Sequence, residues 1–136
     1  MDAYEKIAEI GKALAHPTRL QILQILRLEE ACVCHMEAVI GQRQAHVSQH
    51  LAKLREAGLV EDRRDGMNVF YSLAVEELGS LLDAAVNAAL AVAAETGEVL
   101  TFAPLEHDVT DDCGCPTCQA KANQFVNFVD IRLAEK

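Results

Sequence analysis

The chain has 136 residues, 51% hydrophobic and 24% charged, which predicts one soluble globular domain with enough length for a hydrophobic core. Its net charge of −9 argues against a general binder of polyanions. The N-terminal residues show no basic region followed by an apolar run, and no uninterrupted apolar stretch reaches bilayer length, so we expect a cytoplasmic protein with no membrane partner.

The first segments of the chain predict helices. Residues 3–14 carry apolar side chains at helical spacing. Pro17 then interrupts the pattern and suits the first turn of a second helix, which continues through residues 18–28. Nearly all of its sites are apolar, so we expect this helix to be buried. Residues 32–40 predict a short third helix or turn-helix that ends near Gly41.

Residues 43–60, "RQAHVSQHLAKLREAGLV", predict an amphipathic helix. Val47, Leu51 and Leu54 recur at i, i+4 and i+7 and form one apolar face, and Gly58 stands at the C-terminal cap position. The opposite face is polar and partly basic. A short helix, a tight turn with glycine and such a helix are together typical of a helix-turn-helix.

A β-hairpin is predicted directly after this helix, in "LVEDRRDGMNVFYSL". Two β-prone runs flank Asp65-Gly66, a dipeptide favoured in tight hairpins. The tip carries Arg63, Arg64 and Asn68. A hairpin that follows a helix-turn-helix is a wing.

The rest of the chain divides into a long helix and a less regular tail. Residues 75–95 predict an Ala-rich helix whose long apolar stripe favours a dimer partner over solvent, and Gly97 ends it. We expect residues 1–97 to form a DNA-binding and dimerisation domain and residues 98–136 to form a cysteine-containing extension. Within the extension, the pattern of residues 123–133 fits a strand or a short helix equally well.

Charge and cysteine are unevenly distributed along the chain. Residues 1–73 hold nine Lys or Arg and ten Asp or Glu, whereas residues 74–136 hold three and eleven, so nucleic-acid contacts belong to the first half. The five cysteines form two groups, at 32–34 and at 113–118. An odd number of closely spaced cysteines indicates metal or redox chemistry rather than a disulfide framework.

Four motifs in this order resemble the ArsR/SmtB family of winged-helix, metal-sensing transcriptional repressors. They are "LAHPTRLQILQIL", "ACVCHMEAVI", "QAHVSQHLAKLREAGLV" and "RRDGMNVFYSL", and the resemblance covers about residues 5 to 95. It implies a mainly α fold with a small β-hairpin, a winged helix-turn-helix that dimerises through its first and last helices. It also implies that the homodimer binds double-stranded operator DNA without ligand and releases it when an inducer binds.

The resemblance also implies which residues contact DNA. Gln and Ser at the recognition-helix positions suit base edges, and we add His46 on geometry alone. The wing and helix supply arginine and lysine for phosphates, whereas His50 is expected to pack at the helix edge. A solvated helix face is the competing interpretation. The candidates are Arg43, Gln44, Ala45, His46, Ser48, Gln49, Lys53, Arg63 and Arg64.

Cys32 and Cys34 match the Cys-Val-Cys that many metal sensors of this family place before the recognition helix, although His35 stands where Asp is usual. Residues i and i+2 point about 200° apart in a regular helix. Two thiolates at this spacing converge only from an extended first turn, so we expect the pair at a helix start, which also favours thiolate. The competing interpretation is that both are small buried core residues.

Two sulfurs are too few for a soft-metal site, because Zn(II) or Cd(II) takes about four ligands. Residues 1–31 contain no cysteine and residues 75–95 no histidine, which excludes the commonest zinc-sensor layout and directs attention to the tail. Its thiols either complete the first pair or form a separate three-sulfur site, with His35 and His107 as additional candidates. The candidate ligands are Cys32, Cys34, Cys113, Cys115 and Cys118.

We therefore expect a repressor that responds to a thiophilic ion, namely As(III), Cd(II) or Pb(II), with Zn(II) also compatible. The alternative is a redox or persulfide sensor that uses the same cysteines, since the Cys-x-x-Cys within "CPTC" can close a disulfide. An enzyme is not expected. No βαβ pattern surrounds "CPTC", and neither a Ser/His/Asp nor a Gly-rich phosphate motif is present.

Overall fold

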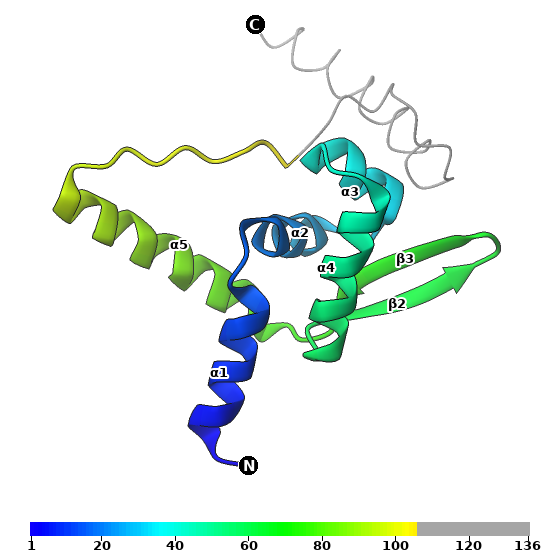
Figure 1. The fold of residues 1–136 in the computed structure, drawn as a ribbon, viewed down its shortest axis with the longest axis horizontal. Coiled ribbons are helices and arrows are strands. Elements are labelled where there is room, and N and C mark those ends of the chain that lie inside the picture. The colour runs from blue at the N-terminus through cyan, green and yellow to red at the C-terminus, as the bar shows by residue number, and fades with distance from the viewer. Residues whose placement is uncertain (106–136) are drawn as a thin grey trace, which may run out of the picture.

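The computed structural model describes residues 1–105, which form five helices and three strands (Figure 1). Helices α2, α3 and α4 gather at the centre, while α1, α5 and the β2–β3 hairpin project from it in different directions. The bounds are α1 Ala3–Leu14, α2 Pro17–Leu28, β1 Ala31–Cys32, α3 Val33–Ile40, α4 Gln44–Glu56, β2 Val60–Asp65, β3 Asn68–Leu73 and α5 Glu77–Thr96.

Local capping sets where the first two helices begin. Asp2 caps α1 through a capping box, in which the Asp2 carboxylate accepts from backbone N–H groups of the first turn and the Glu5 carboxylate accepts from the Asp2 backbone N–H. Helix α2 begins at Pro17, as its sequence predicts. The ring of His16 completes this start, because its Nδ1 accepts a hydrogen bond of 3.1 Å from the backbone N–H of Thr18.

The hydrophobic core lies among α2, α3 and α4, with α2 buried as expected. Burying an aliphatic side chain of this size contributes about 1.5–3 kcal/mol, so these few residues fix the relative positions of the three helices. The largest fully buried side chains are Ile22, Leu23, Ile25, Met36, Val47, Leu51 and Leu54.

A small antiparallel sheet in the order β1-β3-β2 covers one side of the core. The wing hairpin is confirmed, with Asp65 and Asn68 as its closing pair, so Gly66 and Met67 form the two-residue turn. Gly66 has a φ of 62°, a conformation that glycine adopts without strain. Strand β1 was not predicted, and it pairs Ala31 with Tyr71 and Cys32 with Phe70.

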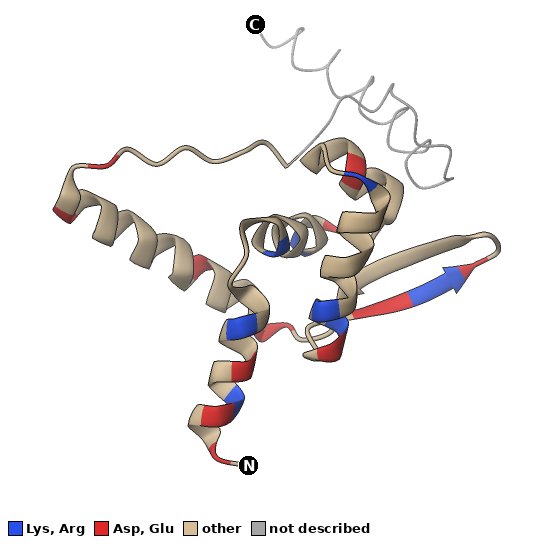
Figure 2. Cartoon of the chain, in the orientation of Figure 1, with Lys and Arg blue, Asp and Glu red and all other residues tan. Residues whose placement is uncertain are grey.

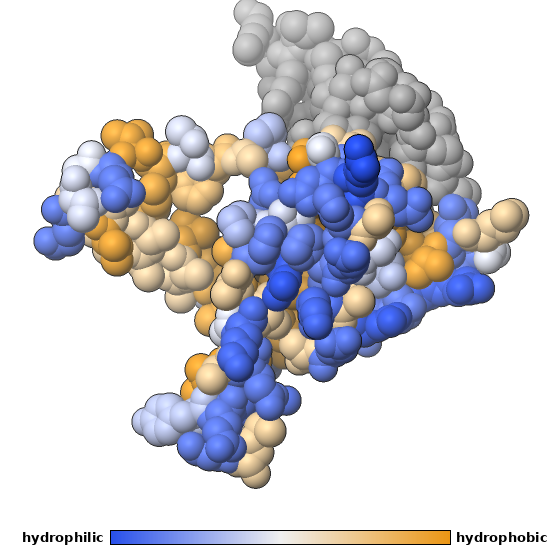
Figure 3. All heavy atoms as spheres, in the orientation of Figure 1, coloured by the Kyte–Doolittle hydropathy of each residue, from blue (hydrophilic) through white to orange (hydrophobic). Residues whose placement is uncertain are grey.

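Helix α5 is attached to the core through its buried Leu78 and Leu82 and through one ion pair. The guanidinium of Arg27 on α2 binds both carboxylate oxygens of Asp83, at 2.6 Å and 2.7 Å. Gly79 leaves room for it, because a Cβ there would lie 3.3 Å from Arg27 Nε. Much of the remaining helix is exposed and apolar (orange in Figure 3).

Helix α5 is long and apolar. By length and composition alone this 20-residue helix would suffice to cross a membrane, although 17% of the relevant window is already buried in the protein. Leu78, Leu82 and Ala93 of the predicted stripe pack into the core of the same chain, so only its exposed part, such as Val92, is available to a partner helix.

The five predicted helices and the wing are thus present within one or two residues of their expected limits, and the mainly α winged helix-turn-helix fold is confirmed. The division into a domain at 1–97 and an extension at 98–136 stays a prediction. Cys113, Cys115, Cys118 and His107 lie outside the described residues.

Candidate DNA-binding surface and thiol site

Helix α4 presents a polar face to solvent because its apolar face is fixed in the core. Val47, Leu51 and Leu54 are each at most 1% exposed. The space-filling view shows a largely hydrophilic surface over this central part of the molecule (Figure 3). All predicted contact residues of the helix and its start are exposed, namely Arg43, Gln44, Ala45, His46, Ser48, Gln49 and Lys53.

The turn before α4 is set by backbone and side-chain contacts. Helix α3 ends at Gly41, whose φ of 74° reverses the chain in the left-handed conformation that favours glycine. Gln42 then donates a hydrogen bond of 2.8 Å from its amide to the hydroxyl of Thr18 on α2. This bond holds the entry to α4 against the core, and no sequence pattern had indicated it.

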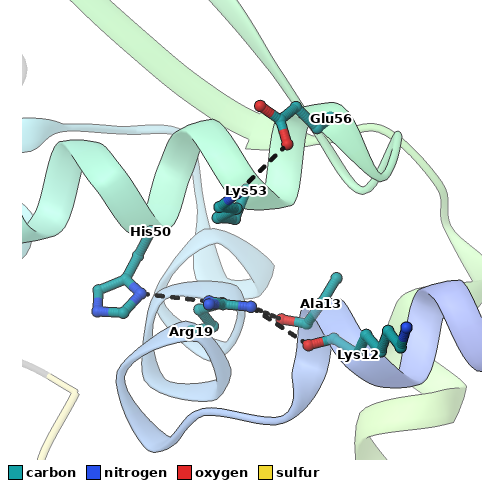
Figure 4. A network of polar contacts seen from close by, with 6 residues as sticks. All are labelled: Lys12, Ala13, Arg19, His50, Lys53 and Glu56. Carbon is teal, nitrogen blue, oxygen red and sulfur yellow. Dashed lines mark hydrogen bonds and ion pairs between the residues drawn. The ribbon is translucent and has the colours of Figure 1, made fainter.

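The inner edge of α4 is linked to α1 and α2 by a polar network (Figure 4). Arg19 donates from Nε to His50 Nδ1 at 3.2 Å and from Nη1 to the carbonyl oxygens of Lys12 and Ala13, also at 3.2 Å. The rings of His50 and His16 lie 4.3 Å apart between centroids. The expectation that His50 packs at the helix edge is confirmed.

This environment lowers the pKa of His50 below its usual value. Partial burial is the largest cause, and the nearby His16, Arg19 and His46 add to it because each disfavours a second positive charge. His50 is therefore held mainly as a neutral acceptor for Arg19, which is the form that the network requires.

The wing carries both signs of charge along β2 (Figure 2). Arg64 is exposed, as predicted for a phosphate contact. Arg63 is also exposed but is already engaged, since Nε donates to Glu30 Oε2 at 3.2 Å and Nη2 donates to Glu30 Oε1. Its hydrogen bonds lower the pKa of Glu30. Glu30 was missed from the sequence because the contact depends on the position of β1.

The sulfur atoms of Cys32 and Cys34 converge at the junction of β1 and α3. Cys32 is the last residue of β1 and the N-cap of α3, with an extended backbone at φ −88° and ψ 166°. Its Sγ lies 2.7 Å from Sγ of Cys34. The expectation that the pair sits at a helix start, with both sulfurs on one side, is confirmed.

The thiol pair packs against the wing rather than facing open solvent. Cys32 is 4% exposed and Phe70 of β3 is 3% exposed, and these two residues form a small cluster with Cys34. Phe70 was not among the predicted site residues. Its position beside Cys32 follows from the pairing of β1 with β3, which the sequence did not indicate.

The described residues supply two sulfurs and no complete metal centre. Within residues 1–105 no group of three or more His, Cys, Asp or Glu is arranged to hold an ion. Cys32 and Cys34 are nevertheless a chemically suitable half of a thiophilic site, because paired sulfurs at a helix start favour soft ions. The ligands that would complete it stay a prediction.

Comparison with known proteins points to one group of regulators. A family described as "Bacterial regulatory protein, arsR family" matches residues 16–62. The chain is 42% identical over 74 residues to a transcriptional repressor SmtB homolog of Synechocystis, an alignment covering 54% of this chain and 56% of that protein. It is 38% identical over 80 residues to a homolog of the cadmium resistance regulatory protein CadC of Staphylococcus aureus, covering 58% and 66%.

A solved structure gives the same fold. The homodimeric winged helix-turn-helix DNA-binding domain Mb0332 of Mycobacterium bovis is 31% identical and superposes with a TM-score of 0.58. The match covers 73% of this chain and 90% of that domain. The chain thus spans nearly all of this structural neighbour but less than two thirds of the SmtB homolog.

Proposed function

Because the chain belongs to the ArsR family of bacterial regulatory proteins, we propose that it is a transcriptional repressor whose DNA binding is controlled at Cys32 and Cys34. As a homodimer it binds double-stranded operator DNA through α4 and the wing. A thiophilic ion, As(III), Cd(II) or Pb(II), binds the thiolates and releases the DNA, and Zn(II) is compatible with the same ligands.

The DNA-binding part of the proposal is supported by the exposed face of α4. Gln44 and Gln49 offer amides that can bind adenine edges in two places, while Ser48 can bond to several bases. Arg43 and Lys53 flank them and suit phosphates. Since the opposite face of α4 is fully buried, these side chains are presented on a rigid element, as base recognition requires.

Dimerisation is supported by the exposed apolar residues of the outer helices. Ile7 on α1 is 62% exposed, and Leu90 and Val92 on α5 are 44% and 67% exposed. Apolar surface at this density favours a second copy of the chain. A symmetric dimer would place two copies of α4 on two half-sites about one helical turn of DNA apart.

The observation that carries the sensing part is the convergence of the two sulfurs close to α4. Ligation of Cys32 and Cys34 would reshape the start of α3, and α3 joins α4 through only three residues, 41–43. A coupling of about 1–3 kcal/mol between the two sites is typical of allosteric proteins. Cys113, Cys115 and Cys118 are proposed to complete the ligand set.

The first experiment measures DNA release by each ion. A duplex selected by the chain from a random library is titrated with protein in a fluorescence anisotropy assay, with and without As(III), Cd(II), Pb(II) and Zn(II). We expect at least one soft ion to weaken binding about tenfold, the effect of roughly 1.4 kcal/mol of coupling, and Cys32→Ala or Cys34→Ala to abolish this change. Full ion-induced release in both variants would refute the site assignment.

A triple variant, Cys113→Ala, Cys115→Ala and Cys118→Ala, tests the second group of thiols. Reduced affinity for the ion, with DNA binding intact, supports their role in completing the site. Unchanged ion affinity and release would assign sensing to Cys32 and Cys34 without them. The number of bound ions per chain and the thiolate-to-metal absorption in each variant separate one shared site from two.

A thiol redox sensor that uses the same cysteines is the second candidate. The sulfurs of Cys32 and Cys34 lie 2.7 Å apart, but a disulfide between residues i and i+2 is strained, so we propose that the Cys-x-x-Cys of Cys115 and Cys118 forms the disulfide. Hydrogen peroxide would take two electrons and two protons from a pair of thiols, forming a disulfide and water. This candidate predicts DNA release by peroxide without metal, reversed by a thiol reductant. Thiol counting by mass before and after oxidation distinguishes it from ion binding.

A further inference from the structure

One cross-strand row of the sheet joins the thiol pair to the wing. Cys32 of β1 lies opposite Phe70 of β3, and Phe70 lies opposite Arg63 of β2. Directly opposed residues of antiparallel strands share one face of a sheet, so the three side chains are neighbours. The guanidinium carbon of Arg63 stands 4.9 Å from the centroid of the Phe70 ring, so the ring separates the thiols from the arginine.

One edge of the Arg63 guanidinium is occupied by a carboxylate. Nε and Nη2 bind the two oxygens of Glu30, and Nη1 lies 3.7 Å from Oδ2 of Asp65 on the same strand. A DNA phosphate can therefore bind the Nε–Nη2 edge of Arg63 in bidentate fashion only by displacing Glu30. Arg64, the next residue, has no carboxylate at ion-pair distance anywhere in residues 1–105.

The position of Glu30 depends on the segment that carries the thiols. Glu30 immediately precedes β1, whose two residues are held by pairing with β3, and Cys32 follows only two residues later. Residues 31–34 therefore set the backbone that aims the Glu30 carboxylate, and a ligand that bridges the two sulfurs would hold this segment in place. The side chains of Arg63 and Glu30 are 53% and 36% exposed, so DNA can reach the pair.

We propose that Glu30 competes with the DNA backbone for Arg63, and that the thiol segment thereby sets how strongly the wing binds DNA. This inference rests on the proposed function. In the DNA complex Arg63 leaves Glu30 for a phosphate. When the thiols are ligated, the 30–34 segment keeps the carboxylate on Arg63, and the wing loses one phosphate contact. The wing is then a second output of the thiol site, in addition to α4.

The test replaces Glu30 by Gln in the full chain and measures binding to the selected duplex over a range of salt concentrations. We expect Glu30→Gln to tighten binding severalfold, because Arg63 then reaches the phosphate without leaving a carboxylate. Both proteins make this contact when no ion is bound, so their log–log salt slopes should be similar, whereas Cd(II) should reduce the slope of the wild-type protein by about 0.9. We also expect Cd(II) to release this variant less completely than the wild-type protein. Circular dichroism checks that each variant is folded.

Two controls isolate the pair from general charge effects. Glu61→Gln removes an equal charge from the same strand as Arg63, so any gain in binding from lower net charge appears in both variants. In an Arg63→Ala background the specific gain from Glu30→Gln should vanish, which is a double-mutant cycle on the ion pair. Arg64→Ala should reduce the slope by a similar amount whether Glu30 is present or replaced.

The outcomes separate this inference from the proposed function. If Glu30→Gln gains no more than Glu61→Gln, or if its gain persists without Arg63, competition by Glu30 is refuted while the repressor proposal stands. If the wild-type protein selects no duplex or no soft ion releases it, the proposed function itself fails. A gain that needs Arg63 and is accompanied by a weaker Cd(II) response supports the inference.

Discussion

Helix α4 and the wing are both aimed at DNA, but they are held in place by different forces. Three fully buried apolar residues fix α4 in the core, whereas in the wing only Val60 and Phe70 are buried, and the rest of β2 is exposed and carries ion pairs such as that of Arg63 with Glu30. Buried packing holds side chains in fixed positions and does not depend on salt. Surface ion pairs contribute little to stability, and salt weakens them. The molecule therefore combines a rigidly packed recognition helix, α4, with a more loosely held wing, and the wing lies directly beside Cys32 and Cys34.

Removing core support from α4 should produce the largest effect. Leu54 is 0% exposed, so Leu54→Ala leaves a cavity and should reduce the free energy of unfolding by about 2–5 kcal/mol. Urea unfolding at a fixed protein concentration, followed by circular dichroism, measures the loss. A loss below about 1 kcal/mol would show that α4 is less rigidly held than its burial implies.

Changing the exposed face of α4 should alter sequence preference without unfolding the protein. Gln49→Ala removes an amide that can bind a base edge, and discrimination at one operator position should fall by about 1–3 kcal/mol. Selection from a random library by the wild-type and variant proteins reveals the position. Equal weakening on all sequences would instead identify Gln49 as a backbone contact.

Weakening the packing of the wing should affect the thiols more than base recognition. Phe70→Leu keeps an apolar residue between Cys32 and Arg63 but shrinks it, at a cost of about 1 kcal/mol in stability. We expect Cys32 and Cys34 to react faster with an aromatic disulfide reagent when the other three cysteines are replaced by Ala. Unchanged reactivity with an unchanged base preference would mean that Phe70 does not shield the thiols.

The smallest effect concerns the polar network behind α4. Since the pKa of His50 is lowered in the folded chain, the unfolded chain binds more protons as the pH falls through the ordinary histidine value of about 6.5. The contribution of neutral His50 to stability is complete above that pH and is lost below it.

His50→Asn tests this dependence, because its side-chain oxygen can still accept from Arg19 but does not titrate. Melting temperatures between about pH 5.5 and 7.5 should fall less on acidification in this variant than in the wild-type chain. His46→Asn, on the exposed face, is the matched control and should retain most of the wild-type dependence. Identical pH profiles for all three proteins would exclude His50 as the titrating group.

Most of the fold was predictable because its signals are local. The spacing of Val47, Leu51 and Leu54 predicts the buried face of α4, and Pro17 and Gly41 mark helix limits through their own backbone preferences. The convergence of the two thiols was also predictable, since an extended residue at a helix start places i and i+2 on one side.

The contacts that join the two regions were not predictable. Strand β1 has only two residues and exists because they pair with residues 70–71, far along the chain. The ion pair of Glu30 with Arg63 depends on that pairing, so no local pattern could reveal that a predicted phosphate ligand is already occupied. Long-range register, rather than propensity, determines both.

The double role of Cys32 as strand end and helix cap affects how its thiol should be removed. Serine, the usual replacement for cysteine, is among the strongest N-cap residues, and Cys32 makes no side-chain capping bond to α3. Cys32→Ser would thus add a capping bond of about 1 kcal/mol and turn the hydroxyl toward the helix backbone. Cys32→Ser would then change the start of α3 as well as remove the sulfur. Alanine adds no capping bond, so Cys32→Ala tests the loss of the sulfur alone.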